Sequence, residues 1–117
     1  LGNLYLEKKD YARSLDQFGK ALNLDPDFAV THYNLGTALM EMKRYPEAIR
    51  HFYKALETMK GKFRKAKTHN NLANALATLG RNHQAMAHYR KALQINPDFP
   101  EARRNMQIVN RRLSKNS

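Results

Sequence analysis

The chain has 117 residues, which is enough for one compact domain or a short array of repeats. Hydrophobic residues make up 42% of it, which argues against wholesale disorder, and no apolar run approaches the roughly 20 residues that span a bilayer. Cysteine is absent, which excludes disulfides, thiolate zinc sites and cysteine nucleophiles. The net charge of +11 by itself suggests a nucleic acid, an anionic membrane surface or an acidic protein as partner.

The sequence repeats itself, first at an offset of 34 residues and then at an offset of 37. A Leu-Gly pair at 1–2 returns at 35–36, and Phe18 returns as Phe52 and then as Tyr89. The triplet Lys-Ala-Leu occurs in every copy, at 20–22, 54–56 and 91–93. Because the first residue is Leu1 and not Met, we expect the first copy to begin part-way through and the chain to belong to something longer.

Each copy contains two amphipathic helical patterns. In the second copy Leu35, Leu39 and Met42 share one helical face, and Pro46 suits the first turn of the next helix. No stretch alternates with the period of a strand. The pattern predicts seven helices, near residues 1–7, 10–23, 29–42, 45–58, 64–79, 82–95 and 99–114.

The repeat resembles the tetratricopeptide repeat, whose motif runs W-x2-L-G-x2-Y, then A-x3-F, then a closing proline. The matching residues are Leu1, Gly2, Tyr5, Phe18, Ala21 and Pro26 in the first copy, Leu35, Gly36, Ala48, Phe52 and Ala55 in the second, and Leu72, Ala85, Tyr89, Ala92 and Pro97 in the third. The resemblance implies an all-α fold of antiparallel helix hairpins stacked as a right-handed α-solenoid.

The predicted organisation is a single domain of three repeats and a cap. The repeats span 1–28, 29–65 and 66–99, and a polar capping helix spans 100–114, as an exposed solenoid end requires. The second copy departs from the pattern because Lys60 replaces the closing proline and three extra residues follow. We expect the flanking helices to extend into this basic connection, or the connection to protrude.

The resemblance also implies that the first helix of each pair lines a concave groove. Inward slots next to the Leu-Gly position hold an asparagine in several copies, and its carboxamide can bond both the N–H and the C=O of an extended peptide. The predicted peptide-binding residues are Asn3, Tyr33, Asn34, Thr37, Lys67, Asn70, Asn71, Asn74, Arg104 and Asn105.

A more specific possibility is the two-carboxylate clamp of chaperone-binding tetratricopeptide domains. Its expected second to fourth residues fall on Asn3, Asn34 and Lys67. Asn71 stands where the clamp has an arginine, so the bidentate grip on a carboxylate is missing. The clamp is therefore less favoured than a column of amides.

The charge is unevenly distributed along the chain. Residues 29–117 carry 17 of the basic residues against 5 acidic ones, which predicts an acidic peptide partner toward the C-terminal half of the groove. His32 and His69 occupy the slot of a large aromatic, which predicts packing and not metal binding. No phosphate loop, carboxylate pair or nucleophile triad occurs, so we expect no enzyme activity, cofactor or metal.

The sequence thus predicts a non-catalytic protein-interaction module that binds a peptide or helix in its groove. One alternative is a basic adaptor for an anionic membrane surface or for nucleic acid, the latter disfavoured because most aromatics fill core slots. Another is a scaffolding segment of a larger enzyme, and self-association is also possible. A soluble protein is expected, with the cytoplasm favoured.

Overall fold

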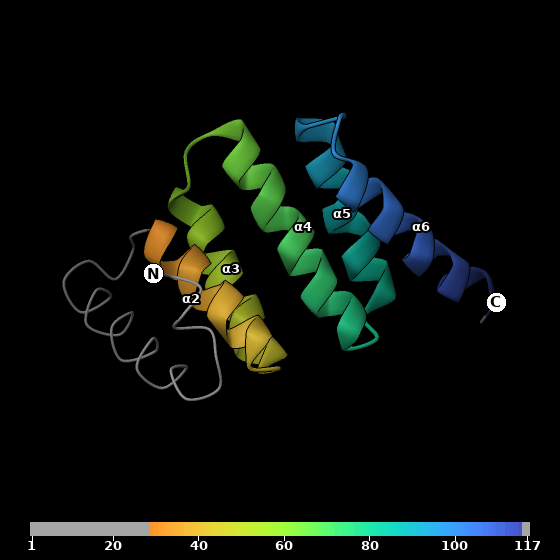
Figure 1. Ribbon diagram of the computed structural model, residues 1–117, viewed down its shortest axis with the longest axis horizontal. Coiled ribbons are helices and arrows are strands. Elements are labelled where there is room, and N and C mark those ends of the chain that lie inside the picture. Colours follow the sequence, from red (N-terminus) through yellow and green to blue (C-terminus); the bar gives the residue numbers. More distant parts are fainter. Residues whose placement is uncertain (1–28, 116–117) are drawn as a thin grey trace. The chain divides into compact units, whose positions relative to one another are not determined.

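The computed structural model describes residues 29–115, and it is all-α over that range, with no strand (Figure 1). The helices are α2 (Ala29–Glu41), α3 (Tyr45–Thr58), α4 (Lys62–Thr78), α5 (Asn82–Ile95) and α6 (Pro100–Lys115). Their bounds agree to within two residues with those predicted from periodicity, and the predicted helices at 1–7 and 10–23 lie outside the described residues. The chain divides into two compact units, Leu1–Met59 and Lys60–Ser117.

In the first unit, α2 packs against α3 through a close contact between Gly36 and Phe52. The Phe52 side chain is completely buried, and a Cβ atom placed on Gly36 would lie 2.7 Å from its Cε1 atom. Any side chain at position 36 would therefore collide with a ring that cannot move aside. The Tyr33 ring, one turn before Gly36 on α2, also lies near Phe52, with the two ring centroids 6.0 Å apart. The glycine of the motif is thus explained by the large aromatic opposite it.

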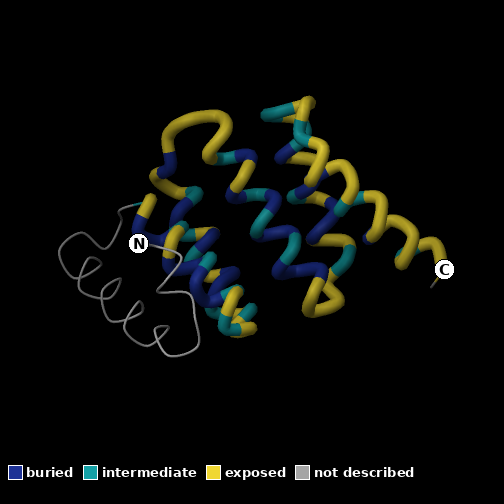
Figure 2. The backbone as a smooth tube through the Cα atoms, in the orientation of Figure 1, coloured by how far each residue is buried: buried dark blue, intermediate teal, exposed yellow. Residues whose placement is uncertain are grey.

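In the second unit, α5 packs against both α4 and α6, and a small residue from each helix lies at the centre. Ala66, Ala92 and Ala102 are all completely buried, with Leu93 and Phe99 packed against them. Small side chains at these points let the three helix backbones approach closely. Apart from Ala102, only Val109 of α6 is buried, and the outer face of this helix is exposed (Figure 2). This is the pattern required of a terminal capping helix.

Helix α4 begins one turn earlier than the repeat requires. At the repeat spacing of 34, Ala66 of α4 corresponds to Pro100, where α6 begins, yet α4 begins at Lys62. Gly61 precedes it with φ of 100°, a backbone conformation that side chains disfavour. The extra residues of the second copy therefore lengthen α4, which was one of the two outcomes expected from the sequence.

Candidate functional site

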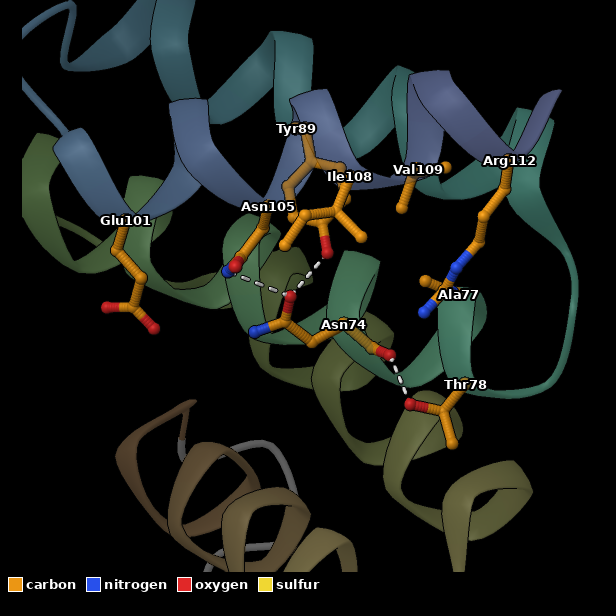
Figure 3. Close-up of a pocket in the computed structure, with 9 residues that line it drawn as sticks. All are labelled: Asn74, Ala77, Thr78, Tyr89, Glu101, Asn105, Ile108, Val109 and Arg112. Carbon is orange, nitrogen blue, oxygen red and sulfur yellow. Dashed lines mark hydrogen bonds between the residues drawn. The ribbon is translucent and has the colours of Figure 1, made fainter. Parts of the chain in front are cut away.

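A pocket of about 550 Å³ lies in the second unit, between α4 and α6, and Tyr89 of α5 also lines it (Figure 3). The residues that line it are Asn74, Ala77, Thr78, Tyr89, Glu101, Asn105, Ile108, Val109 and Arg112. It combines one cation, one carboxylate and several amide or hydroxyl groups with the exposed side chain of Ile108. Such a mixture of a few polar groups around an apolar patch is typical of a binding site.

Asn74 is the centre of the hydrogen bonding in this pocket. The Tyr89 hydroxyl donates to Asn74 Oδ1, and Asn105 Nδ2 donates to the same oxygen over 3.2 Å (Figure 3). With two donors on this oxygen, the carboxamide of Asn74 offers its N–H groups to a ligand. The Thr78 hydroxyl is engaged too, because it donates to the Asn74 backbone carbonyl over 2.8 Å.

The Tyr89 phenol is held in its donor form. Its pKa is raised to about 12, mainly by burial, while the charge of Arg112 lowers it and that of Glu101 raises it by smaller amounts. The hydroxyl therefore stays protonated at neutral pH and keeps the Asn74 carboxamide oriented. Arg112 and Asn74 are then the groups with which the pocket donates hydrogen bonds to a ligand.

The structure brings two of the predicted groove residues, Asn74 and Asn105, into this pocket. Asn3 lies outside the described residues. Lys67 and Arg104 are exposed but do not line it, and Asn71 is half-buried. Peptide contact by these residues stays a prediction.

Three other predicted residues have roles within the fold. Asn70 is 1% exposed and contributes no open surface. In the first unit the Thr37 hydroxyl donates to the Asn34 backbone carbonyl over 2.8 Å, and Tyr33 packs on Phe52. Asn34 itself is exposed. Thr37 and Tyr33 therefore make contacts within the first unit.

The sequence argument missed Thr78 and Arg112, which occupy the same repeat slot, 34 residues apart. Both lie one helical turn beyond the inward column, four residues after Asn74 and Ile108 respectively. Extending the series of inward-facing positions by one more helical turn would have included both residues. It would not have shown that Tyr89 reaches the pocket from α5.

Each unit also contains a histidine pair that joins the two helices of a hairpin. His32 Nδ1 lies 3.1 Å from His51 Nδ1, and His69 Nδ1 lies 3.0 Å from His88 Nδ1. In both pairs the rings are stacked, with centroids 5.4 and 5.2 Å apart. An N–H···N bond requires that one ring donates and that the other, neutral ring accepts. Among the residues that the structure describes, no group of three or more metal-ligating side chains forms.

Protonation of the second pair is disfavoured. Burial, with smaller contributions from the charges of His88, Lys91 and Lys65, lowers the pKa of His69 to about 4. Burial and Lys91 also lower the pKa of His88. The pair is neutral at physiological pH and packs as a structural contact, as the sequence predicted for His69.

We therefore expect the second unit to lose stability as the pH falls from about 6.5 toward about 4. In that window the unfolded chain binds protons at imidazoles that the folded pair keeps neutral, so protons favour unfolding. Replacing His69 and His88 together with glutamine should reduce this loss by about 1–2 kcal/mol, a value discounted for partial exposure. Urea unfolding at pH of about 7.5 and about 4.5 measures the difference.

His83 provides the control for that experiment because it is an exposed histidine of the same unit. The His83→Gln variant should keep the pH dependence of the unmodified chain. If it flattened the profile as much as the double variant, the paired rings would not be the cause.

The net positive charge of the chain belongs entirely to the second unit. Residues 1–59 carry eight basic and eight acidic residues, whereas residues 60–117 carry 13 basic and 2 acidic ones. The whole net charge of +11 therefore lies in the unit that holds the pocket. An anionic ligand is favoured electrostatically there.

Comparison with known families accounts for this architecture. A family model described as tetratricopeptide repeat matches residues 27–98, and a second, described as TPR repeat, matches residues 2–43. The chain belongs to the tetratricopeptide repeat family. The first match covers the four helices α2 to α5, and the resemblance inferred from the sequence motif is confirmed.

Solved tetratricopeptide structures share the fold at low sequence identity. The crystal structure of MamA has a TM-score of 0.85 and 19% identity, over 97% of this chain and 65% of that one. The first TPR of Spaghetti (RPAP3) has a TM-score of 0.85 and 21% identity, over 97% and 87%. The N-terminal domain of stress-induced protein-1 from C. elegans has a TM-score of 0.79 and 24% identity, over 94% and 89%. These likenesses confirm the all-α solenoid fold class.

Human nuclear autoantigenic sperm protein is 30% identical over 70 residues. The match takes in 53% of this chain but only 9% of that protein, so the chain spans a small part of its length. In the part of the tetratricopeptide chain that the structure describes, no helix combines the length and apolar character needed to cross a membrane.

Proposed function

We propose that the chain is a non-catalytic protein-interaction module whose second unit binds an extended, acidic peptide segment in the α4–α6 pocket. A peptide carbonyl accepts from the Asn74 carboxamide, and a peptide N–H donates to the Asn105 carboxamide oxygen. Arg112 binds a carboxylate, and an apolar side chain covers Ile108.

The observation that carries this proposal is the set of donors facing the pocket. Tyr89 and Asn105 both donate to Asn74 Oδ1, so the Asn74 N–H groups and the Arg112 guanidinium are offered to acceptors. Carbonyl and carboxylate oxygens are the acceptors that a peptide supplies. The +11 charge of the second unit favours the carboxylate, and Glu101 at the rim favours a peptide N–H or a basic side chain beside it.

Related structures support a peptide as the ligand class. The Spaghetti (RPAP3) domain is described as bound to the HSP90 peptide SRMEEVD, and the second TPR domain of human RPAP3 as a complex with the HSP70 peptide SGPTIEEVD. Both peptides end in two glutamates, a valine and an aspartate. Because Asn71 occupies the slot of the clamp arginine, we assign the main carboxylate contact in this chain to Arg112.

Selection from a random library tests the proposal without a known partner. Displayed peptides of about 12 residues should become enriched in Asp and Glu when selected on the unmodified chain, and this enrichment should vanish on Arg112→Glu. For the best selected peptide, Arg112→Gln and Asn74→Ala should each weaken binding about tenfold, the usual cost of one charged or well-placed hydrogen bond. Fluorescence anisotropy measures the affinities.

Arg81→Gln is the matched control because Arg81 is exposed in the same unit but does not line the pocket. It removes the same charge and should weaken binding less than threefold, as a screened distant charge does. The proposal fails if the selected peptides lack acidic residues, or if Arg81→Gln and Arg112→Gln lose affinity equally. Circular dichroism of every variant should match that of the unmodified chain.

A further inference from the structure

The second unit has another charged surface, which lies outside the α4–α6 pocket. It is the segment Lys60–Lys67, called here the basic segment, which contains the extra first turn of α4. Its cations are Lys60, Lys62, Arg64, Lys65 and Lys67, all exposed except Lys65, which is half-buried. Five of eight consecutive residues are therefore positively charged, and none of them lines the α4–α6 pocket.

Phe63 lies in the middle of these cations and is 73% exposed. It belongs to the turn of α4 that precedes Ala66, the first residue of this helix packed against α5 and α6. An exposed phenylalanine in a first turn contributes nothing to a core, and the repeat pattern does not require it. In the described part of residues 60–117 it is the single exposed Phe or Tyr.

The charge of the basic segment is not neutralised nearby in the sequence. No Asp or Glu occurs between Glu57 and Asp98, a stretch that contains all of α4 and α5. Within the residues that the structure describes, no ion pair joins the segment to a carboxylate. Lys65 instead lies near enough to His69 to depress the pKa of that imidazole. The segment is thus a surface of uncompensated positive charge.

We propose that the basic segment docks on the surface of an anionic lipid membrane, with Phe63 inserted among the headgroups. Dense Lys and Arg attract anionic lipid, and an aromatic side chain at the interface adds the apolar contact that charge alone lacks. A single apolar residue surrounded by cations matches this geometry. A nucleic-acid surface would need several exposed aromatics to stack successive bases, and this unit presents one.

Co-sedimentation of the full chain with vesicles tests the proposal. Binding should be measurable on phosphatidylcholine vesicles with about 30% phosphatidylserine, at about 0.1 M salt, and weak on pure phosphatidylcholine. The triple variant Lys60→Gln, Lys62→Gln, Arg64→Gln should bind about 100-fold more weakly, since each cation contributes about fivefold. Phe63→Ser should bind about tenfold more weakly, and it removes no core contact.

The matched control removes the same charge elsewhere on the same unit. Arg81→Gln, Arg111→Gln and Lys115→Gln change exposed residues outside the basic segment. This triple variant should lose less than about tenfold. Arg112→Gln, which tests the peptide pocket, should leave vesicle binding within about twofold, so the two proposals fail independently.

The absence of tryptophan from the sequence allows a direct readout of insertion. The Phe63→Trp variant carries a single indole, whose emission should shift to the blue on phosphatidylserine vesicles and be quenched by brominated acyl chains. Tyr53→Trp, at an exposed position of the first unit, should show neither change. These signals report whether the side chain at position 63 enters the membrane, and not merely whether the chain binds the vesicle.

Three outcomes would overturn the proposal. The first is equal loss of vesicle binding in the two triple variants, which would indicate delocalised attraction to the whole unit. The second is an unshifted Phe63→Trp spectrum on bound vesicles. The third is tighter binding to single-stranded RNA or duplex DNA than to vesicles at equal phosphate concentration, which would assign the basic segment to nucleic acid.

Discussion

Replacement of Phe52 by alanine should lower the free energy of unfolding by about 3–5 kcal/mol, the usual cost of deleting a fully buried phenylalanine. The ring is completely buried between α2 and α3 and contacts Gly36, which cannot fill the space left behind. The first unit should therefore lose its packing at moderate denaturant concentrations. Urea unfolding followed by far-ultraviolet circular dichroism measures the change.

The neighbouring Tyr53 serves as the control because its side chain is 44% exposed on the same helix. Tyr53→Ala should cost less than about 1 kcal/mol, as substitutions at exposed positions usually do. A cost for Phe52→Ala no larger than that for Tyr53→Ala would mean that the ring is not a core element of the hairpin.

Tyr89→Ala should destabilise the second unit by a similar amount, about 3–5 kcal/mol. Tyr89 occupies the same repeat slot as Phe52 and is 1% exposed, but its hydroxyl also donates to Asn74 Oδ1 at the pocket. Truncation removes both the packing and the group that orients the carboxamide. Unfolding should be followed together with binding of the selected acidic peptide, so that the two losses are measured on one protein.

Tyr89→Phe separates these two effects because it keeps the ring and deletes only the hydroxyl. It should cost about 1 kcal/mol of stability, the typical net value of one hydrogen bond. It should also weaken peptide binding, because the Asn74 carboxamide can then rotate and present its oxygen to the ligand. Unchanged affinity in Tyr89→Phe would show that the hydroxyl does not set the donor pattern of the pocket.

Much of the fold follows from local sequence. The bounds of α3 and α5 were predicted to the residue, because apolar spacing and, in α3, the proline of the first turn are properties of a few adjacent positions. The core slots of Phe52 and Tyr89 followed from the repeat, since equivalent residues in stacked units meet equivalent surroundings.

The site was less predictable because it depends on where side chains from different helices converge. The predicted groove residues include Asn74 and Asn105, which the structure joins by a hydrogen bond, while peptide contact by them stays a prediction. The predicted set also included Asn70, which is buried, because slots one residue apart on a helix differ by about 100° in direction. Arg112 is not among the predicted groove residues, because only the packing of α6 places it in the same pocket as Asn74.

The sequence by itself determined the repeat, the helices, the aromatic and small-residue slots and the total charge, because each depends on residue identity and periodic spacing. Only the tertiary structure decided where the two units divide, which donors Asn74 leaves for a ligand and that Phe63 stands outside the core. These properties depend on distances between helices, and interhelical distances result from packing, which no local pattern encodes.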